Sequence, residues 1–452
     1  MLLRTIFIAV LLLLLVGAAS SRNEAASATE TVPILYTSAK SYEPLAWMHG
    51  EDRFPSGATI YVRDASISHP LVPIFAASAD PSVSFDGGQV LFAGKAHAQD
   101  PWQIWEVAAS GGEPKRLTSF PEDCVRPFYL PDDRVVYARK LGGRYVIETK
   151  ELASNKTVDL TYIQSGVLPT DVLRDGRILF AAAYPLGSQG NPEIYTVYSD
   201  GSGVESYRCD HGIARHSGRQ SGSGNIVFVS ARGLAGFTSA RAEQFSVAAP
   251  AGEYAGDVAE TDSGNWLVSW RPDAKTSFRL MRWAPGTPQL ELVVVEQDVN
   301  LVQPTLLAPR AVPNRHPSGL HDWDNANLLC LNAYTSKYKF ASESIHSVRL
   351  YTRDSEGNAK LLGTAPVERD GSFFVQVPTE QPLQIELLDS AGNTLKRESG
   401  YFWMRRGEQR ACVGCHAGPE TAPENAVPLI LLKSTTPANM IGAAGQSAAG
   451  GH

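Results

Sequence analysis

The sequence has few cysteines, few charged residues and no basic surplus, and each shortage excludes a class of protein. Five cysteines in 452 residues are too few for a disulfide-stapled scaffold, and their number is odd. Charged residues make up 19% of the chain, below the ~25% of an average soluble protein. The net charge of −7 argues against a nucleic-acid partner, which would need a positive surface. The chain also lacks a phosphate-binding loop, a dinucleotide fingerprint and the G-x-S-x-G elbow of α/β-hydrolases.

Apolar residues and turn formers are plentiful. Hydrophobic residues make up 43% of the chain, enough for packed cores. The 39 glycines and 29 prolines indicate a turn-rich β protein. At about 150 residues per domain, the length predicts roughly three domains.

The N-terminus has the pattern of a secretory signal peptide. Arg4 precedes the apolar run Ile6–Val16, and small residues follow it. The run is shorter than the ~20 apolar residues that span a bilayer, which argues against the alternative of a membrane anchor. We therefore expect residues 1–28 to be removed and the mature protein to be periplasmic or secreted, without a membrane anchor.

A repeated unit fills the first two-thirds of the chain. In each copy a turn rich in Gly and Asp precedes a short apolar strand, and the strand ends are 45, 43, 48 and 40 residues apart. These strands end at Phe92, Tyr137, Phe180, Phe228 and Val268, and a weaker copy ends at Tyr36. Four short strands per unit at this period are typical of a β-propeller; a β-sandwich with accidental spacing is the alternative. We predict a propeller of about six blades over residues 29–303, which resembles TolB-type propellers.

The rest of the chain divides into four parts. Residues 304–327 are rich in proline and form a connector. Alternating strands with close turns predict a small β-sandwich over residues 328–400. Residues 401–433 contain the sequence CVGCH, and residues 434–452, rich in Ala, Gly and Ser, are predicted to be a disordered tail. The fold class is therefore all-β, with a propeller, a sandwich middle domain and a short C-terminal segment.

The CVGCH sequence carries the chemistry. Cys412, Cys415 and His416 have the spacing of c-type haem attachment, in which two thiols form thioethers with the porphyrin and the histidine binds the iron. A redox disulfide would need a thioredoxin-like βαβ unit, and a structural zinc site would need a second cysteine pair. We therefore predict one covalent haem c in the segment 401–433.

Other residues near the motif are candidates for contacts with this haem. Arg405, Arg406 and Arg410 could pair with the propionates, because guanidinium groups match carboxylate geometry; a solvated basic turn is the alternative. Met404 and Met440 are candidates for the sixth iron ligand, and a five-coordinate iron that binds a small molecule is also open.

The order of these parts resembles a known family. A propeller, a middle segment and the motif run resemble the alpha subunit of hydrazine synthase and its relatives, over nearly the whole mature chain; the stretches that carry the likeness are LLCLNAY, VRLY, APVERDGSFFVQVP and WMRRGEQRACVGCH. The run Gly363–Pro419 is the most specific. The resemblance implies c-type haem, and beta and gamma partners in a complex that builds hydrazine from a nitric-oxide-derived intermediate and ammonium.

The sequence departs from this family at the haem. It has one CxxCH motif, so the second haem of the alpha subunit has no counterpart. In the family, a tyrosine four residues beyond the motif histidine binds the active haem, and that histidine binds zinc; here the position is Glu420. We therefore expect His416 to be an ordinary haem ligand and the chain to be a relative, not a hydrazine synthase.

Two functions remain open from the sequence. The first is an exported mono-haem redox protein with a redox or complex-forming protein partner, whose iron carries electrons or binds a small nitrogen or oxygen species; any enzyme activity would be haem-dependent and oxidoreductase-like. The second is a propeller-based binding or scaffold protein with an accessory haem.

The remaining cysteines and histidines suggest a second metal. Cys209, His211 and His216 offer soft and imidazole ligands close together, which zinc accepts. A buried thiol, or a disulfide between Cys209 and Cys124, is the alternative. Cys330 is predicted to lie in the core of the sandwich.

Overall fold

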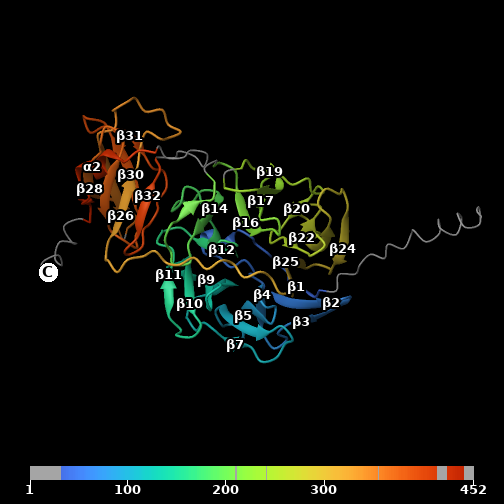
Figure 1. The fold of residues 1–452 in the computed structure, drawn as a ribbon. Coiled ribbons are helices and arrows are strands. Elements are labelled where there is room, and N and C mark those ends of the chain that lie inside the picture. The colour runs from blue at the N-terminus through green and yellow to red at the C-terminus, as the bar shows by residue number, and fades with distance from the viewer. Residues whose placement is uncertain (1–31, 209–210, 241, 355, 415–424, 442–452) are drawn as a thin grey trace, which may run out of the picture.

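The computed structural model describes residues 32–208, 211–240, 242–354, 356–414 and 425–441 (Figure 1). Within these residues the chain forms eight β-sheets, with two short helices. The helices are the 3-10 helix η1 (Ala46–His49) and the α-helix α2 (Leu429–Lys433).

Several predicted features lie outside the described residues. They are the signal peptide at residues 1–28, Cys209, and the motif residues Cys415 and His416. In the part of the chain that is described, neither helix has the length and apolarity to cross a bilayer.

Six of the sheets, in the described residues between Ile34 and Leu306, surround a common axis and form a β-propeller (Figure 1). Sheet 1 contains β25 (Asn300–Leu306), β1 (Ile34–Ala39), β2 (Thr59–Asp64) and β3 (Ile67–Pro70). Sheet 2 contains β4 (Ala77–Val83), β5 (Gln89–Lys95), β6 (Gln103–Ala108) and β7 (Lys115–Arg116). Sheet 3 contains β8 (Cys124–Tyr129), β9 (Arg134–Leu141), β10 (Arg144–Glu151) and β11 (Thr157–Asp159).

The other three propeller sheets follow in chain order. Sheet 4 contains β12 (Val167–Val172), β13 (Ile178–Ala183), β14 (Pro192–Val197) and β15 (Glu205–Ser206). Sheet 5 contains β16 (Arg215–Gln220), β17 (Ile226–Ser230), β18 (Gly233–Phe237) and β19 (Phe245–Ser246). Sheet 6 contains β20 (Glu253–Tyr254), β21 (Ala259–Glu260), β22 (Trp266–Arg271), β23 (Arg279–Trp283) and β24 (Leu290–Val294).

The repeated strands of the sequence occupy one position in this architecture. Each is the second strand of its sheet, namely β1, β5, β9, β13, β17 and β22. Phe92, Tyr137, Phe180 and Phe228 on these strands are almost fully buried, because neighbouring sheets cover both faces. The predicted repeat is therefore confirmed as the unit of the propeller.

The ring closes through its first sheet. Strand β25, which follows sheet 6 in sequence, pairs antiparallel with β1, from Ile34 opposite Leu306 to Ala39 opposite Asn300. Strands β21 and β25 also lie in contact, which joins the last sheet to the first. This pairing completes the first sheet with a strand from the end of the propeller and so closes the ring.

The innermost strands share an irregularity that turns polar side chains toward the axis. In five of the six sheets one residue there has a positive φ, in the left-handed region that L-residues seldom adopt. These residues are Asp80, Arg126, Ser217, Asp257 and Gln303. A regular strand would point each of these side chains into the space between sheets. The bulge turns it toward the axis instead.

The last two sheets form a β-sandwich beside sheets 3 and 4 (Figure 1). One contains β32 (Gln409–Cys412), β26 (Ala326–Cys330), β29 (Phe373–Val377) and β33 (Ala438–Asn439). The other contains β28 (Ala359–Pro366), β27 (Ser347–Arg353), β30 (Gln384–Leu388) and β31 (Thr394–Arg397). Leu328 and Val375 from the first sheet pack against Val348 and Leu387 from the second.

The sandwich extends further along the chain than the sequence predicts. Residues 401–433 were expected to be a separate segment, yet β32 within them pairs in parallel with β26. Residues 434–441, expected in the disordered tail, include β33, which pairs in parallel with β29, and the buried Met440. Parallel strands from distant segments have no local turn signal, so sequence patterns do not reveal them. Residues 442–452 lie outside the described residues.

The connector crosses one mouth of the central channel on its way to the sandwich. Its backbone is fixed to sheet 2 by Arg310 N–H, which donates to Phe85 O at 2.9 Å, and to sheet 4 by Asn314 N–H, which donates to Arg174 O at 2.7 Å. Residues 308–313 therefore roof a cavity of about 580 Å³ at this mouth.

Candidate functional site

A cavity of about 290 Å³ lies between sheet 4 of the propeller and the sandwich. The propeller wall includes Tyr184, Tyr195 and His211, and the sandwich wall includes Phe402 and Cys412. Half of the lining residues are aromatic or aliphatic. An apolar cavity with a few polar groups is the usual form of a cofactor site.

Cys412 reaches this cavity at the end of β32, an edge strand of its sheet. It is the last residue of β32, and it lies opposite Cys330 in the parallel ladder with β26. The N–H of Leu331 donates to Cys412 O at 2.9 Å and fixes the end of the strand. Cys330 is buried in the sandwich core, as predicted, and also lines the cavity. The first cysteine of the CVGCH motif therefore lies in the wall of the cavity, whereas Cys415 and His416 are outside the described residues.

Hydrogen bonds across the junction hold the two walls in place. Trp403 is fully buried and donates from Nε1 to Gly201 O at 2.9 Å. The N–H of Tyr401 donates to Leu186 O at 2.9 Å. Both aromatic side chains pack into the apolar cluster between sheets 3 and 4. The cavity is thus set by tertiary contacts on both sides.

The three arginines near the motif have different surroundings. Arg410 lines the cavity and is held by Glu408, with 2.6 Å between Nη2 and Oε1. Arg405 pairs with Glu380 at 3.2 Å and packs on the propeller surface. Arg406 is largely exposed. Of the three predicted propionate partners, Arg410 alone is among the cavity's lining residues.

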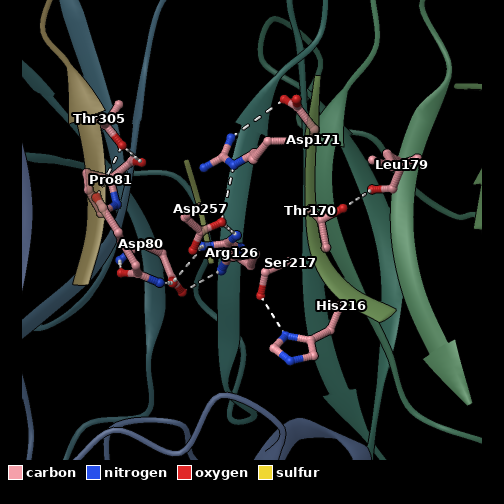
Figure 2. A network of polar contacts seen from close by, with 12 residues as sticks. Asp80, Pro81, Arg126, Thr170, Asp171, Leu179, His216, Ser217, Asp257 and Thr305 are labelled. Carbon is pink, nitrogen blue, oxygen red and sulfur yellow. Dashed lines mark hydrogen bonds and ion pairs between the residues drawn. The ribbon is translucent and has the colours of Figure 1, made fainter. Parts of the chain in front are cut away.

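His211 and His216 lie in different cavities. His211 stacks on Tyr184 in the cavity at the junction, with ring centroids 3.8 Å apart. His216 lies on β16 beside the propeller axis, where its Nδ1 is 3.0 Å from Ser217 Oγ (Figure 2). Burial lowers the pKa of His216 to about 4. The structure does not bring together the histidines of the predicted zinc site, and the described residues contain no group of three ligands that could hold a metal ion; Cys209 lies outside them.

The residues of the junction cavity fit a c-type haem by their chemistry. Cys412 offers a thiol for a thioether, and Arg410 offers a guanidinium for a propionate. The Nδ1 atom of His211 is buried and has no hydrogen-bond partner. Met404 and Met440, the sixth-ligand candidates from sequence, are instead buried in the core of the sandwich and are not among the residues that line the cavity.

A second group of polar residues, which the sequence did not suggest, lies on the propeller axis (Figure 2). Arg126 donates through both terminal nitrogens to Asp257, with Nη1 2.9 Å from Oδ2. Arg219 lies 3.2 Å from Asp257 and 3.6 Å from Asp171. Burial would raise the pKa of Asp257, but Arg126 and Arg219 lower it to about 2.

The axial network continues to sheets 1 and 2. Asp80 accepts from Arg53 and Gln303, each at 2.5 Å, and lies 3.8 Å from Arg126. Burial opposes ionisation of Asp80, but Arg53 and Arg126 outweigh it and lower its pKa. Each of these buried charges has an opposite charge beside it, which makes this network a structural core of the ring.

A sequence signal for this network exists in hindsight. Asp80, Arg126 and Gln303 each directly precede a proline at the same place in the repeat. Proline cannot donate to the ladder, and it favours a break in strand pairing at that position.

Cys124 is a buried thiol at the start of β8 and forms no disulfide. Burial raises its pKa to about 12. Since the thiolate is the reactive form, Cys124 is chemically inert at neutral pH.

Comparisons with known proteins show that the chain is similar to one enzyme. Residues 334–417 match the family described as hydrazine synthase alpha subunit middle domain. The structure of hydrazine synthase from Kuenenia stuttgartiensis superposes with a TM-score of 0.76 at 16% identity, covering 89% of this chain and 72% of that chain. TolB from Acinetobacter baumannii has a TM-score of 0.41 at 17% identity, covering 63% of this chain and 68% of that chain. No curated protein matches the sequence significantly. The chain is therefore similar to hydrazine synthase in fold over most of its length, and to the middle domain of that enzyme's alpha subunit in sequence.

Proposed function

We propose that this chain is an exported redox protein that carries one covalent haem c between a six-bladed propeller and the sandwich. Cys412 and Cys415 would form the thioethers, and His416 would be the proximal iron ligand. The observation that carries the proposal is the position of Cys412 in the wall of an apolar cavity at the junction. If the motif occurred by chance, Cys412 would have no reason to face such a cavity.

The haem, when bound, would supply a one-electron couple. The side chains of the cavity would exclude water and neutralise charge. Tyr195 and Phe402 line the cavity and would exclude water from a bound haem, which would tune its potential through the local dielectric. Glu408 holds the guanidinium of Arg410 in place through two hydrogen bonds. Arg410 can then neutralise a propionate that would otherwise be buried with its charge unpaired.

The similarity to hydrazine synthase supports both the haem and a protein partner, and we propose that this chain works with a redox or complex-forming partner. Glu420 stands where the family has its tyrosine ligand. We therefore propose a redox role other than hydrazine synthesis.

The test is covalent haem attachment in cells that mature c-type cytochromes. The full chain is expressed with its N-terminal segment, and intact-mass spectrometry measures both the haem adduct and the removal of the signal peptide. We expect one haem per chain, and no adduct in the double variant Cys412→Ala/Cys415→Ala. Cys330→Ala is the matched control, because Cys330 lies beside Cys412 in the same wall and should leave attachment intact. A folded, exported wild-type protein without a haem adduct would refute the proposal.

A further inference from the structure

We propose that His211 supplies the second axial ligand of the haem iron. This inference rests on the proposed function, because it needs a haem in the junction cavity. His211 lies on the propeller side of the cavity, so the propeller itself would supply a ligand to the haem iron.

The position of His211 supports this role. It lines the cavity on the propeller side, whereas Cys412 lines it on the sandwich side, so the two residues approach the same space from opposite walls. The ring stacks on Tyr184, with 3.8 Å between centroids and 14° between planes, which fixes its orientation. An axial ligand needs such a fixed ring, because a freely rotating imidazole loses entropy on binding.

The groups behind the ring favour the tautomer that a ligand needs. Glu193 Oε2 lies 3.7 Å from His211 Nδ1. The carboxylate of Glu193 is itself fixed, since it accepts from Arg215 Nη1 at 2.9 Å and from the N–H of Ile194 at 2.9 Å. A carboxylate beside Nδ1 favours a proton on that nitrogen and leaves the lone pair of Nε2 for a metal, as in the carboxylate–histidine pairs of metal sites.

The unpartnered nitrogen is the second observation. His211 Nδ1 is buried and has no hydrogen bond, because 3.7 Å is too long for one. Leaving a buried donor without a partner is unfavourable. A ligand bond at Nε2 would explain why the ring occupies this position despite that cost.

The other described histidines lie elsewhere. His316 stacks on Tyr198 and His321 on Trp323, both in the connector. Among the residues that the structure describes, His211 is the one imidazole or thioether in the cavity lining. Tyr184, Tyr195, Tyr401 and Cys330 also line the cavity, but a phenol or a thiol must lose a proton before it binds iron, and a neutral imidazole need not. The geometry therefore assigns the sixth position to nitrogen, and predicts a low-spin iron that is closed to small ligands and has a lower potential than a methionine-ligated one.

The test uses the purified, haem-loaded full chain, with absorption and electron paramagnetic resonance spectra and carbon monoxide titration of the ferrous form. We expect wild type to be low-spin and to resist carbon monoxide, and His211→Gly to be high-spin and to bind it. Added imidazole should restore the low-spin spectrum of His211→Gly, which shows that the variant is folded. His211→Met should stay low-spin with a raised potential. His316→Ala is the control and should match wild type.

The outcomes separate this inference from the proposed function. A haem-loaded wild type that is high-spin, or a His211→Gly variant with an unchanged spectrum, overturns the inference and leaves the haem proposal standing. A wild type without covalent haem refutes the proposed function, and the inference with it.

Discussion

The axial pair of Arg126 and Asp257 offers a strong test of how the propeller is held together. In Arg126→Met, Asp257 loses two charge-assisted hydrogen bonds, and Asp80 loses a cation 3.8 Å away. Removing one partner of a buried ion pair typically costs about 3–5 kcal/mol. Asp257 keeps Arg219 at 3.2 Å, so we expect a loss of about 3 kcal/mol in the free energy of unfolding at pH 7.

The same variant should change how stability depends on pH. The pKa of Asp257 is about 2 in the folded chain, below its ordinary value of 3.8. Its ionised form therefore stabilises the folded state above the unfolded pKa, and this contribution, about 2 kcal/mol at ~1.4 kcal/mol per pKa unit, is lost as the pH falls from about 4 to 2. Without Arg126 the pKa rises toward its ordinary value, so the variant should show a smaller loss over this range.

Urea unfolding followed by far-UV circular dichroism, at several pH values, measures both effects. Arg177→Met is the matched control, because Arg177 also pairs with two carboxylates, but those of Asp175 and Glu205 are half exposed. Such pairs contribute about 0–1 kcal/mol. A loss below 1 kcal/mol in Arg126→Met, or one equal to the control, would refute the view that the axial network stabilises the ring.

Three further predictions concern single side chains. The pKa of His216 is about 4 in the folded chain, so the unfolded chain binds a proton first as the pH falls below 6.5. The free energy of unfolding should therefore drop by about 3 kcal/mol by pH 4. Urea titrations should show that His216→Gln flattens this slope. Trp403→Ala should lower the free energy of unfolding by about 3–5 kcal/mol, because it loses core packing and the hydrogen bond to Gly201, and it should speed proteolysis of the connector. The control Trp323→Ala, at an exposed position, should have neither effect. A thiol reagent should label Cys124 only in denaturant, and rapid labelling of the folded chain would contradict its burial.

The propeller could be predicted because its strands are local units. Each repeat carries its own turn and apolar strand, so Phe92, Phe180 and their equivalents mark the second strand of every sheet in the sequence itself. The closure by β25 and the parallel pairings of β32 and β33 join residues far apart in the chain, and no local pattern records them.

The candidate site, too, could be predicted from the sequence only in part. The spacing of the cysteines in CVGCH predicts that Cys412 attaches a haem, and the nearby arginines are predicted to pair with its propionates. The side chains of Arg405 and Arg406 nevertheless point to other partners, because Glu380 lies beside both. His211 was grouped with His216 because five residues separate them, yet the chain places them in different cavities.

By itself, then, the sequence determined the repeat, the all-β class and the CVGCH spacing, since these depend on residues close together in the chain. Only the tertiary structure decided what faces Cys412. The cavity exists because Trp403 and Tyr401 fix the sandwich against sheet 4, and that contact brings His211 to the wall opposite Cys412. The axial network likewise depends on the ring, because Arg126 and Asp257 come from sheets 3 and 6 and meet only when the propeller closes.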